Sequence, residues 1–198
     1  MSHPQTSIYL VRHGETAWTR SRQHTGLTDL PLTEIGERDA SRLGVRLRPL
    51  TVSHIYTSPL QRARRTCELA GFGARAIVDP DLMEWNYGNY EGLTSEQIQQ
   101  QQPDWRLFRD GCPGGESLAE IGARADRVIA RVRALDADAI IFSSGHIMRV
   151  LGARWLGLDA SGGRYLALGT TTLSILGYEH DKSEPVIKLW NDARPEMD

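Results

Sequence analysis

The feature that most constrains the fold of this chain is a regular alternation of short apolar strands with helices. The predicted strands span residues 7–11, 53–57, 76–78, 139–142, 171–178 and 186–191, and the predicted helices span residues 33–48, 58–70, 117–135 and 145–155. Strands separated by helical crossovers run parallel in one sheet. The alternation therefore predicts a three-layer α/β/α sandwich, in which a mainly parallel sheet is covered by helices on both faces.

Residues that typically cap helices mark several of the predicted boundaries. Thr33 precedes a helix in which Ile35, Leu43 and Leu47 are expected to face the core. Ser58 followed by proline is typical of a helix start, with serine at the N-cap and proline at the first helical position. Two capping boxes are predicted further along the chain, formed by Thr94 with Gln97 and by Ser117 with Glu120.

Length and composition favour a single globular domain over residues 1–198. The net charge of -2 gives no bulk signal for a nucleic-acid or membrane partner. Residues 79–117 are rich in Trp, Tyr, Gly and Pro, and we interpret them as a lid-like insertion. The terminal strands and the aromatic content are compatible with a homodimer.

Cysteine usage and the amino terminus favour a cytoplasmic location. Cys67 and Cys112 show neither a C-x-x-C pattern nor a zinc-ligand spacing, so a reducing compartment is the default. The first seven residues are polar and do not resemble a signal peptide. No apolar run reaches the length that would span a membrane.

Cationic side chains follow three of the predicted strands. Arg12 and His13 follow the first strand, Arg62 lies in the first turn after the second, and His146 follows the strand at residues 139–142. The carboxyl ends of parallel strands meet at the edge of the sheet where ligands bind. Several cationic donors around one point are costly unless an anion lies among them. Because arginine and helix N-termini both suit phosphate, the sequence predicts a phosphate site at this edge.

The motifs that carry these residues resemble those of the histidine phosphatase superfamily, which has the phosphoglycerate-mutase-like fold. Four motifs occur in the family's order: LVRHGET at residues 10–16, TSPLQRARRTCELA at 57–70, LMEWNYGNYEGLT at 82–94 and SSGHIMRVLGARWLGL at 143–158. The resemblance extends from residue 8 to about residue 176.

The resemblance implies a phosphatase that works through a phosphohistidine. His13 would be the nucleophile, and Arg12, Arg62 and His146 would neutralise the phosphoryl oxygens. Glu84 would be the general acid and later the general base. A backbone carbonyl would hold one ring nitrogen of His13, and Gly14 would let the backbone bend close to it. No metal or other cofactor is implied.

Further segments resemble a phosphatase branch that includes sedoheptulose-1,7-bisphosphatase-like enzymes and bacterial acid phosphatases. The resemblance assigns substrate contacts to His24, Thr25, Gly26 and Tyr87. Tyr87 and Tyr90 either face the substrate or pack within the insertion, and with Trp85 they would shield Glu84 from water.

For some polar residues near these motifs the sequence leaves open whether the side chain contacts the substrate or only supports the structure. For others it indicates a structural role. Ser58 either donates to phosphate or only caps its helix. Arg149 either reaches a second phosphate or a sugar hydroxyl, or forms a surface salt bridge. Glu15 and Glu91 are interpreted as structural partners of arginines.

The sequence favours a metal-independent phosphatase of small phosphorylated metabolites, sugar phosphates first. One alternative is a phosphoglycerate mutase. The chain departs from the true mutases of the superfamily, which carry asparagine where Thr19 stands here. They also carry a lysine and paired arginines, which are absent between Glu84 and His146. The other alternative is a module that binds phosphate without turnover, which would need the cations but neither a nucleophile nor an acid.

Overall fold

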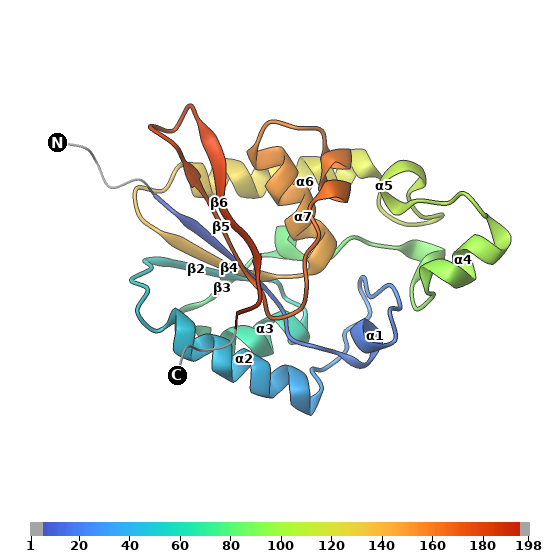
Figure 1. The fold of residues 1–198 in the computed structure, drawn as a ribbon, viewed down its shortest axis with the longest axis horizontal. Helices are drawn as coiled ribbons and strands as arrows, with labels where there is room; N and C mark the ends of the chain where they lie inside the picture. The colour runs from blue at the N-terminus through green and yellow to red at the C-terminus, as the bar shows by residue number, and fades with distance from the viewer. Residues whose placement is uncertain (1–5, 195–198) are drawn as a thin grey trace.

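The centre of the molecule is a six-stranded sheet within residues 6–194, the part of the chain that this computed structural model describes (Figure 1). The strand order is β3-β2-β4-β1-β5-β6. The strands are β1 (Ile8–Arg12), β2 (His54–Thr57), β3 (Ile77–Val78), β4 (Ala139–Ser143), β5 (Leu173–Tyr178) and β6 (Pro185–Asp192). The first four are mutually parallel, whereas β5 is antiparallel to both β1 and β6. The mainly parallel sheet is therefore confirmed.

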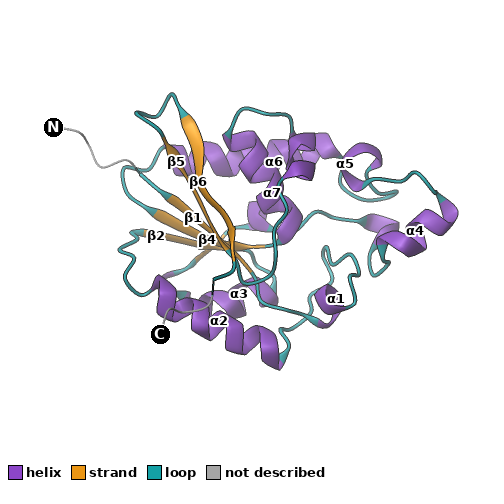
Figure 2. Ribbon diagram, in the orientation of Figure 1, coloured by secondary structure: helices purple, strands orange, loops and turns teal. Residues whose placement is uncertain are grey.

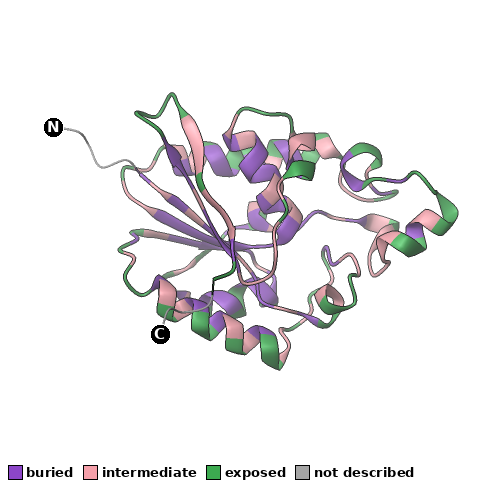
Figure 3. Ribbon diagram, in the orientation of Figure 1, coloured by how far each residue is buried: buried purple, intermediate pink, exposed green. Residues whose placement is uncertain are grey.

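Helices cover both faces of this sheet, as Figure 2 shows. α2 (Glu34–Leu47) and α3 (Gln61–Leu69) lie on one face, and α6 (Leu118–Arg133) and α7 (Gly145–Trp155) lie on the other. Successive side chains of β1 enter opposite cores: Ile8 and Leu10 pack on the α6 and α7 side, and Val11 packs on the α2 and α3 side. Figure 3 shows the buried strands between the layers. The predicted three-layer sandwich is confirmed.

The helix starts follow the predicted caps, with α3 as the exception. Ser58 and Pro59 precede α3, whose N-cap is Leu60 and whose first amide, that of Gln61, donates to the Asp29 carboxylate at 2.7 Å. A carboxylate distant in sequence thus replaces the serine cap that we predicted. The other predicted caps all accept the expected backbone hydrogen bonds, at Thr33, Thr94 and Ser117.

The insertion (residues 79–117) extends beyond the sheet and approaches α1 (Ala17–Arg20), as Figure 1 shows. It carries α4 (Ser95–Gln101) and α5 (Leu107–Asp110). Its contact with the loop after α1 includes a bridge between Gln23 and Thr94 and a hydrogen bond from the His24 amide to the Leu93 carbonyl, at 2.9 Å. The insertion therefore meets the loop that follows the Arg12–His13 pair.

Short 3-10 helices complete the described elements: η1 (Gly73–Arg75), η2 (Pro80–Leu82), η3 (Gly88–Tyr90) and η4 (Ala160–Tyr165). Within residues 6–194 no helix is both long and apolar enough to cross a bilayer. The prediction about a signal peptide falls mostly on residues 1–5, which lie outside the described residues.

Candidate active site

His13 lies at the carboxyl end of β1 and is only 2% exposed. Its Nδ1 lies 2.8 Å from the Gly14 carbonyl oxygen. Because a carbonyl oxygen can only accept, Nδ1 carries the proton and Nε2 keeps its lone pair. Burial lowers the pKa of His13 well below its ordinary value, and the charges of Arg62 and Arg12 lower it further. His13 is thus neutral at pH 7, with one bare nitrogen, which is the form a nucleophile needs.

Gly14 is required for a close approach between the loop after β1 and helix α2. A Cβ at Gly14 would lie 2.5 Å from the carbonyl oxygen of Gly36, and one at Gly36 would lie 2.3 Å from the carbonyl oxygen of Glu15. The Gly14 amide donates to the Thr66 hydroxyl at 3.0 Å. The glycine that we expected to bend the chain therefore acts by letting two backbones pack together.

Two arginines flank His13 from different elements. Arg12 donates through Nη1 to the Leu168 carbonyl at 2.5 Å. Arg62, fully buried in α3, donates to carbonyls of the loop at residues 25–28, at 2.8 to 3.1 Å. The Nε atom of each arginine is buried without a hydrogen-bond partner in the described part of the chain. An unpartnered buried donor is costly, so an anion beside His13 would be stabilised here.

Glu84 reaches from the insertion to the amino end of α7 and is 5% exposed. Its Oε2 accepts from the His146 amide, and its Oε1 accepts from the amides of Ile147 and Trp85, each at 2.9 Å. The N-cap of α7 makes no side-chain cap of its own, so Glu84 fills this role. Backbone donors at the helix start hold the carboxylate, and Trp85 beside it in sequence is fully buried. The predicted shielding of Glu84 by its aromatic neighbours stays a prediction.

His146 and Tyr87 form a hydrogen-bonded pair, with Nδ1 of His146 at 2.6 Å from the Tyr87 hydroxyl. Burial lowers the pKa of His146 well below its ordinary value, with the charge of Arg149 as the next cause. Burial also raises the pKa of Tyr87, which keeps its hydroxyl protonated. The His24 ring packs beside them, 4.9 Å from the Tyr87 ring, and burial lowers its pKa.

We expect the free energy of unfolding to decrease as the pH falls from 7 to 5. The pKa values of His13, His24 and His146 lie below their ordinary value of 6.5, chiefly because these groups are buried. Below that pH the unfolded chain binds protons that the folded chain does not, so acid favours unfolding. Each histidine contributes at most about 1.4 kcal/mol per pH unit.

Urea unfolding at a series of pH values measures this slope. His24→Gln is the matched variant, because it removes one of the three groups and leaves the other two. Its slope between pH 7 and pH 5 should be shallower than that of the original chain, and an equal slope would contradict the assignment of His24 as a partly buried histidine with a lowered pKa.

These side chains share one cavity of about 180 Å³, the site cavity. It is smaller than the roughly 300–1,000 Å³ of sites that hold drug-sized ligands, so it suits a small metabolite. The site cavity is lined by Arg12, His13, Thr19, Arg22, Gln23, His24, Thr25, Glu84, Tyr87 and His146. Most of the predicted site residues are therefore brought together, whereas Arg62, Gly26 and Ser58 are not among the lining residues.

Gly26 and Ser58 support the site without facing the site cavity. The Gly26 amide donates to the Glu91 carboxylate at 2.8 Å, and its carbonyl accepts from Arg62 at 2.8 Å. Glu91 also accepts from the Thr28 amide at 3.0 Å, so it holds backbone amides where we had predicted an arginine partner. Ser58 is fully buried, and its hydroxyl lies 3.4 Å from the Leu60 amide. Neither residue lines the site cavity in this structure, and their predicted contacts with substrate stay predictions.

Sequence reasoning missed Thr19, Arg22 and Gln23 as lining residues of the site cavity. Thr19 had a signal, because the mutases of the superfamily carry asparagine at its place. For Arg22 and Gln23 the signal is position alone, because they lie between the Arg12–His13 pair and His24. Glu15 pairs with Arg20 at 2.7 Å, as predicted.

Arg149 is held by backbone carbonyls and forms no salt bridge in the described part of the chain, while its predicted contact with a second phosphate or a sugar hydroxyl stays a prediction. Its guanidinium donates to the carbonyls of Gly163 and Arg164, at 3.0 and 3.2 Å, and lies over the Phe108 ring at 4.8 Å. It is therefore occupied by backbone carbonyls of η4 and by an aromatic ring, and it does not line the site cavity.

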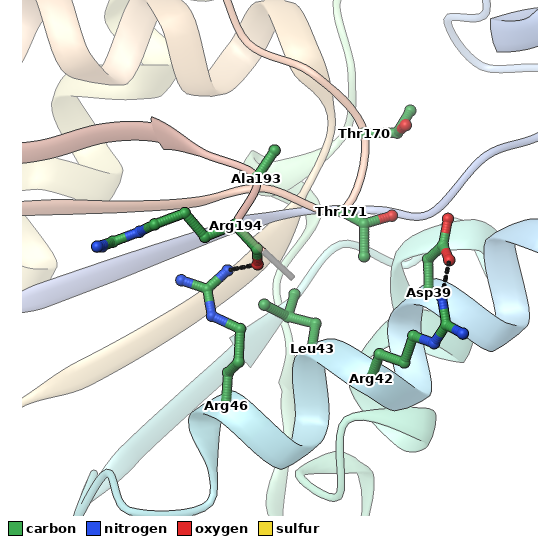
Figure 4. Close-up of a pocket in the computed structure, with 8 residues that line it drawn as sticks. All are labelled: Asp39, Arg42, Leu43, Arg46, Thr170, Thr171, Ala193 and Arg194. Carbon is green, nitrogen blue, oxygen red and sulfur yellow. Dashed lines mark hydrogen bonds and ion pairs between the residues drawn. The ribbon is translucent and has the colours of Figure 1, made fainter. Parts of the chain in front are cut away.

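A second cavity of about 250 Å³ lies beside α2 (Figure 4). Its arginines already have partners: Arg46 donates to the Arg194 carbonyl and to Asp192, both at 2.8 Å, and Arg42 lies 3.9 Å from Asp39. No nucleophile-and-base pair lines this second cavity, whereas His13 and Glu84 both line the site cavity.

Comparison with known proteins identifies the family of this chain. The model of the histidine phosphatase superfamily (branch 1) matches residues 8–193. The chain belongs to the histidine phosphatase superfamily. This membership confirms the family and the fold that the four motifs predicted.

Relatives of this histidine phosphatase include an acid phosphatase, a sedoheptulose bisphosphatase and a probable phosphoglycerate mutase. The chain is 38% identical over 177 residues to an acid phosphatase of Mycobacterium tuberculosis, covering 87% of each chain. It is 38% identical over 181 residues to sedoheptulose 1,7-bisphosphatase of Saccharomyces cerevisiae, covering 75% of this chain and 67% of the relative. A probable phosphoglycerate mutase of Erwinia tasmaniensis is 34% identical over 193 residues, covering 92% of this chain and 89% of the relative.

A solved structure of an open reading frame from Mycobacterium tuberculosis has the same fold as this histidine phosphatase. The two superpose with a TM-score of 0.89 at 36% identity, covering 94% of this chain and 97% of the other.

Proposed function

We propose that this histidine phosphatase hydrolyses small phosphorylated metabolites, sugar phosphates first, through a phosphohistidine on His13. The observation that carries the proposal is the neutral His13 ring, which has a bare Nε2 and lies between two arginines with unpartnered Nε atoms. The acid phosphatase and the sedoheptulose bisphosphatase among its relatives support a phosphomonoester hydrolase that acts on sugar phosphates.

In the first step, Nε2 of His13 attacks phosphorus and the bond to the leaving oxygen breaks. Arg12 and Arg62 stabilise the charge on the phosphoryl oxygens. His146 adds a donor: when the Tyr87 hydroxyl donates to its Nδ1, the proton of the neutral ring stays on Nε2 and can bind a phosphoryl oxygen. Glu84, which lines the site cavity, enters this step protonated and gives its proton to the leaving oxygen, so that an alcohol departs and the Glu84 carboxylate remains for the second step.

In the second step, water attacks the phosphohistidine and Glu84 takes up a proton from this water. The nitrogen–phosphorus bond breaks, phosphate leaves, and His13 returns to its neutral form. Because Glu84 and Tyr87 both belong to the insertion, we propose that the insertion completes the site over a bound substrate, as a lid would.

The mutase alternative is less well supported by the insertion. The true mutases of the superfamily, from which this chain departs, use cations of this region to hold a carboxylate. Here the insertion contains no lysine, Arg106 donates to the Trp105 carbonyl at 2.7 Å, and Arg109 pairs with Asp110 at 2.8 Å. These arginines already have partners within the insertion itself, which favours hydrolysis.

We also propose a cytoplasmic location and a homodimer. Cys67 and Cys112 are free and buried, which suits a reducing compartment. Strand β6 forms one edge of the sheet and offers a surface on which a second copy could pair. Light scattering of the purified protein measures the oligomeric state.

A panel of phosphorylated metabolites tests the proposal through phosphate release, with and without EDTA. We expect sugar phosphates to release phosphate at the same rate in both conditions, because side chains supply the positive charge. Within residues 6–194 there is no cluster of three or more acidic, histidine or cysteine side chains that could hold a metal ion. A loss of activity with EDTA that magnesium or zinc restores would contradict metal independence.

The same panel separates the phosphatase from the mutase. It includes 3-phosphoglycerate with a bisphosphoglycerate primer, for which we expect slow phosphate release and little 2-phosphoglycerate. Rapid isomerisation without release of phosphate would reverse the choice between the two activities.

A further inference from the structure

Arg22 occupies a backbone position that normally belongs to glycine. The amide of Gln23 donates to the Trp18 carbonyl at 2.9 Å across the end of α1, which is the hydrogen bond of a Schellman motif. Arg22 is the C′ residue of this motif and has a left-handed φ of 61°. Glycine is favoured there because any Cβ is strained in this conformation.

The same arginine lies at the mouth of the site cavity. Of the arginines that line this cavity, Arg12 is partly buried and donates to a carbonyl, whereas Arg22 is exposed. Arg22 makes no hydrogen bond or salt bridge in the described part of the chain. A strained residue that projects a cation without a hydrogen-bonding partner into a candidate active site indicates a functional constraint.

The other arginines near the site cavity are engaged elsewhere. Arg62 and Arg149 donate to backbone carbonyls. Arg20, two residues before Arg22, pairs with Glu15 at 2.7 Å and does not line the site cavity. Arg22 is thus the lining arginine that remains available to a group on the substrate other than the phosphoryl group beside His13.

We propose that Arg22 binds a second phosphate on the substrate, so that the enzyme prefers small bisphosphates to monophosphates. This inference rests on the proposed function, because the first phosphate is placed beside His13. A guanidinium at the rim can form charge-assisted hydrogen bonds to a distal phosphate. Glu96, in the first turn of α4, is close enough to Arg22 to interact with its charge. The pKa of Glu96 is lowered by hydrogen bonds at the start of its own helix and, more weakly, by the charge of Arg22. A distal phosphate must compete with this carboxylate for Arg22.

Direct binding tests the proposal in a chain that cannot turn over. Isothermal titration calorimetry with the His13→Ala chain compares fructose 1,6-bisphosphate with fructose 1-phosphate and fructose 6-phosphate. We expect the bisphosphate to bind about tenfold more tightly than either monophosphate, as one charge-assisted contact allows. Adding Arg22→Gln should remove this advantage, and higher salt should weaken it. Arg20→Gln is the matched control, because it removes a neighbouring charge that does not line the site cavity. In this variant the bisphosphate should still bind more tightly than either monophosphate.

Stability separates this role from a structural one. Arg22→Gly removes the strained Cβ, so its thermal unfolding midpoint should be equal to or above that of the original chain, while the bisphosphate advantage is lost. The proposal is overturned if the chain with Arg22 shows no preference for the bisphosphate, or if Arg22→Gln leaves the ratio of dissociation constants unchanged. Failure of the proposed function would be seen in a different experiment, the panel of phosphorylated metabolites, in which the original chain would release no phosphate.

Discussion

Replacing His13 with alanine is expected to lower kcat for a sugar phosphate by at least about 10³-fold, because the proposed mechanism passes the phosphoryl group through His13 alone. The remaining rate would come from the arginines and from substrate binding. Steady-state phosphate release measures the loss. His13→Asn is a companion variant, since its amide can still donate to the Gly14 carbonyl that holds the His13 ring.

The control for both variants is the fold. His13 is buried, so the alanine variant leaves a cavity and is expected to unfold at a lower temperature. Circular dichroism and binding of inorganic phosphate should show that the folded state and its anion site survive. Substantial turnover by the folded alanine variant would rule out His13 as the nucleophile.

Glu84→Gln is expected to slow phosphoenzyme formation by roughly 10²–10⁴-fold with a sugar phosphate, and much less with nitrophenyl phosphate. A sugar alkoxide is a poor leaving group and needs a proton, whereas a nitrophenolate departs with little help. Single-turnover rates of phosphoenzyme formation are the quantity to measure, because Glu84 acts as a base in the second step with both substrates.

The structure adds a reason to compare two substrates in the same variant. Glu84 caps α7 through the amides of His146 and Ile147, and a glutamine amide group would face one of these donors. Leaving a buried donor unpaired costs about 1–3 kcal/mol of stability. This loss affects both substrates alike, so the difference between them isolates proton transfer. Equal losses would show that Glu84 is not the leaving-group acid.

The convergence of Arg12, His13 and His146 could be predicted because it depends on sheet topology. Strands β1 and β4 are parallel neighbours, with Arg12 beside Ser143, so residues that follow the two strands meet at one edge. The residue types at these ends then indicate phosphate.

The environments of Arg62 and Glu84 could not be predicted, because distant loops decide them. Arg62 is held by the carbonyls of Thr25, Gly26 and Thr28, which are 34 to 37 residues away in sequence. Glu84 caps a helix that begins some sixty residues later. Neither contact leaves a local pattern, whereas a helix cap such as Thr33 does.

The face that helix α2 buries differs from the predicted one for a similar reason. Ile35 is 41% exposed, although we expected it to face the core with Leu43 and Leu47. The contact between Gly14 and Gly36 fixes the rotation of the helix, so that Gly36 and Ala40 join the buried side. A pairing of two glycines from different elements is invisible to hydrophobic periodicity.

The most direct test of the mechanism is to trap the phosphoenzyme. The original chain is mixed with a sugar phosphate, quenched within one turnover without acid, digested and analysed by mass spectrometry. The account predicts a phosphoryl group on the His13 ring that survives base and is lost in acid, and that is absent from the His13→Ala chain. A phosphoryl group on another residue, or turnover with no phosphoenzyme at any time, would contradict it.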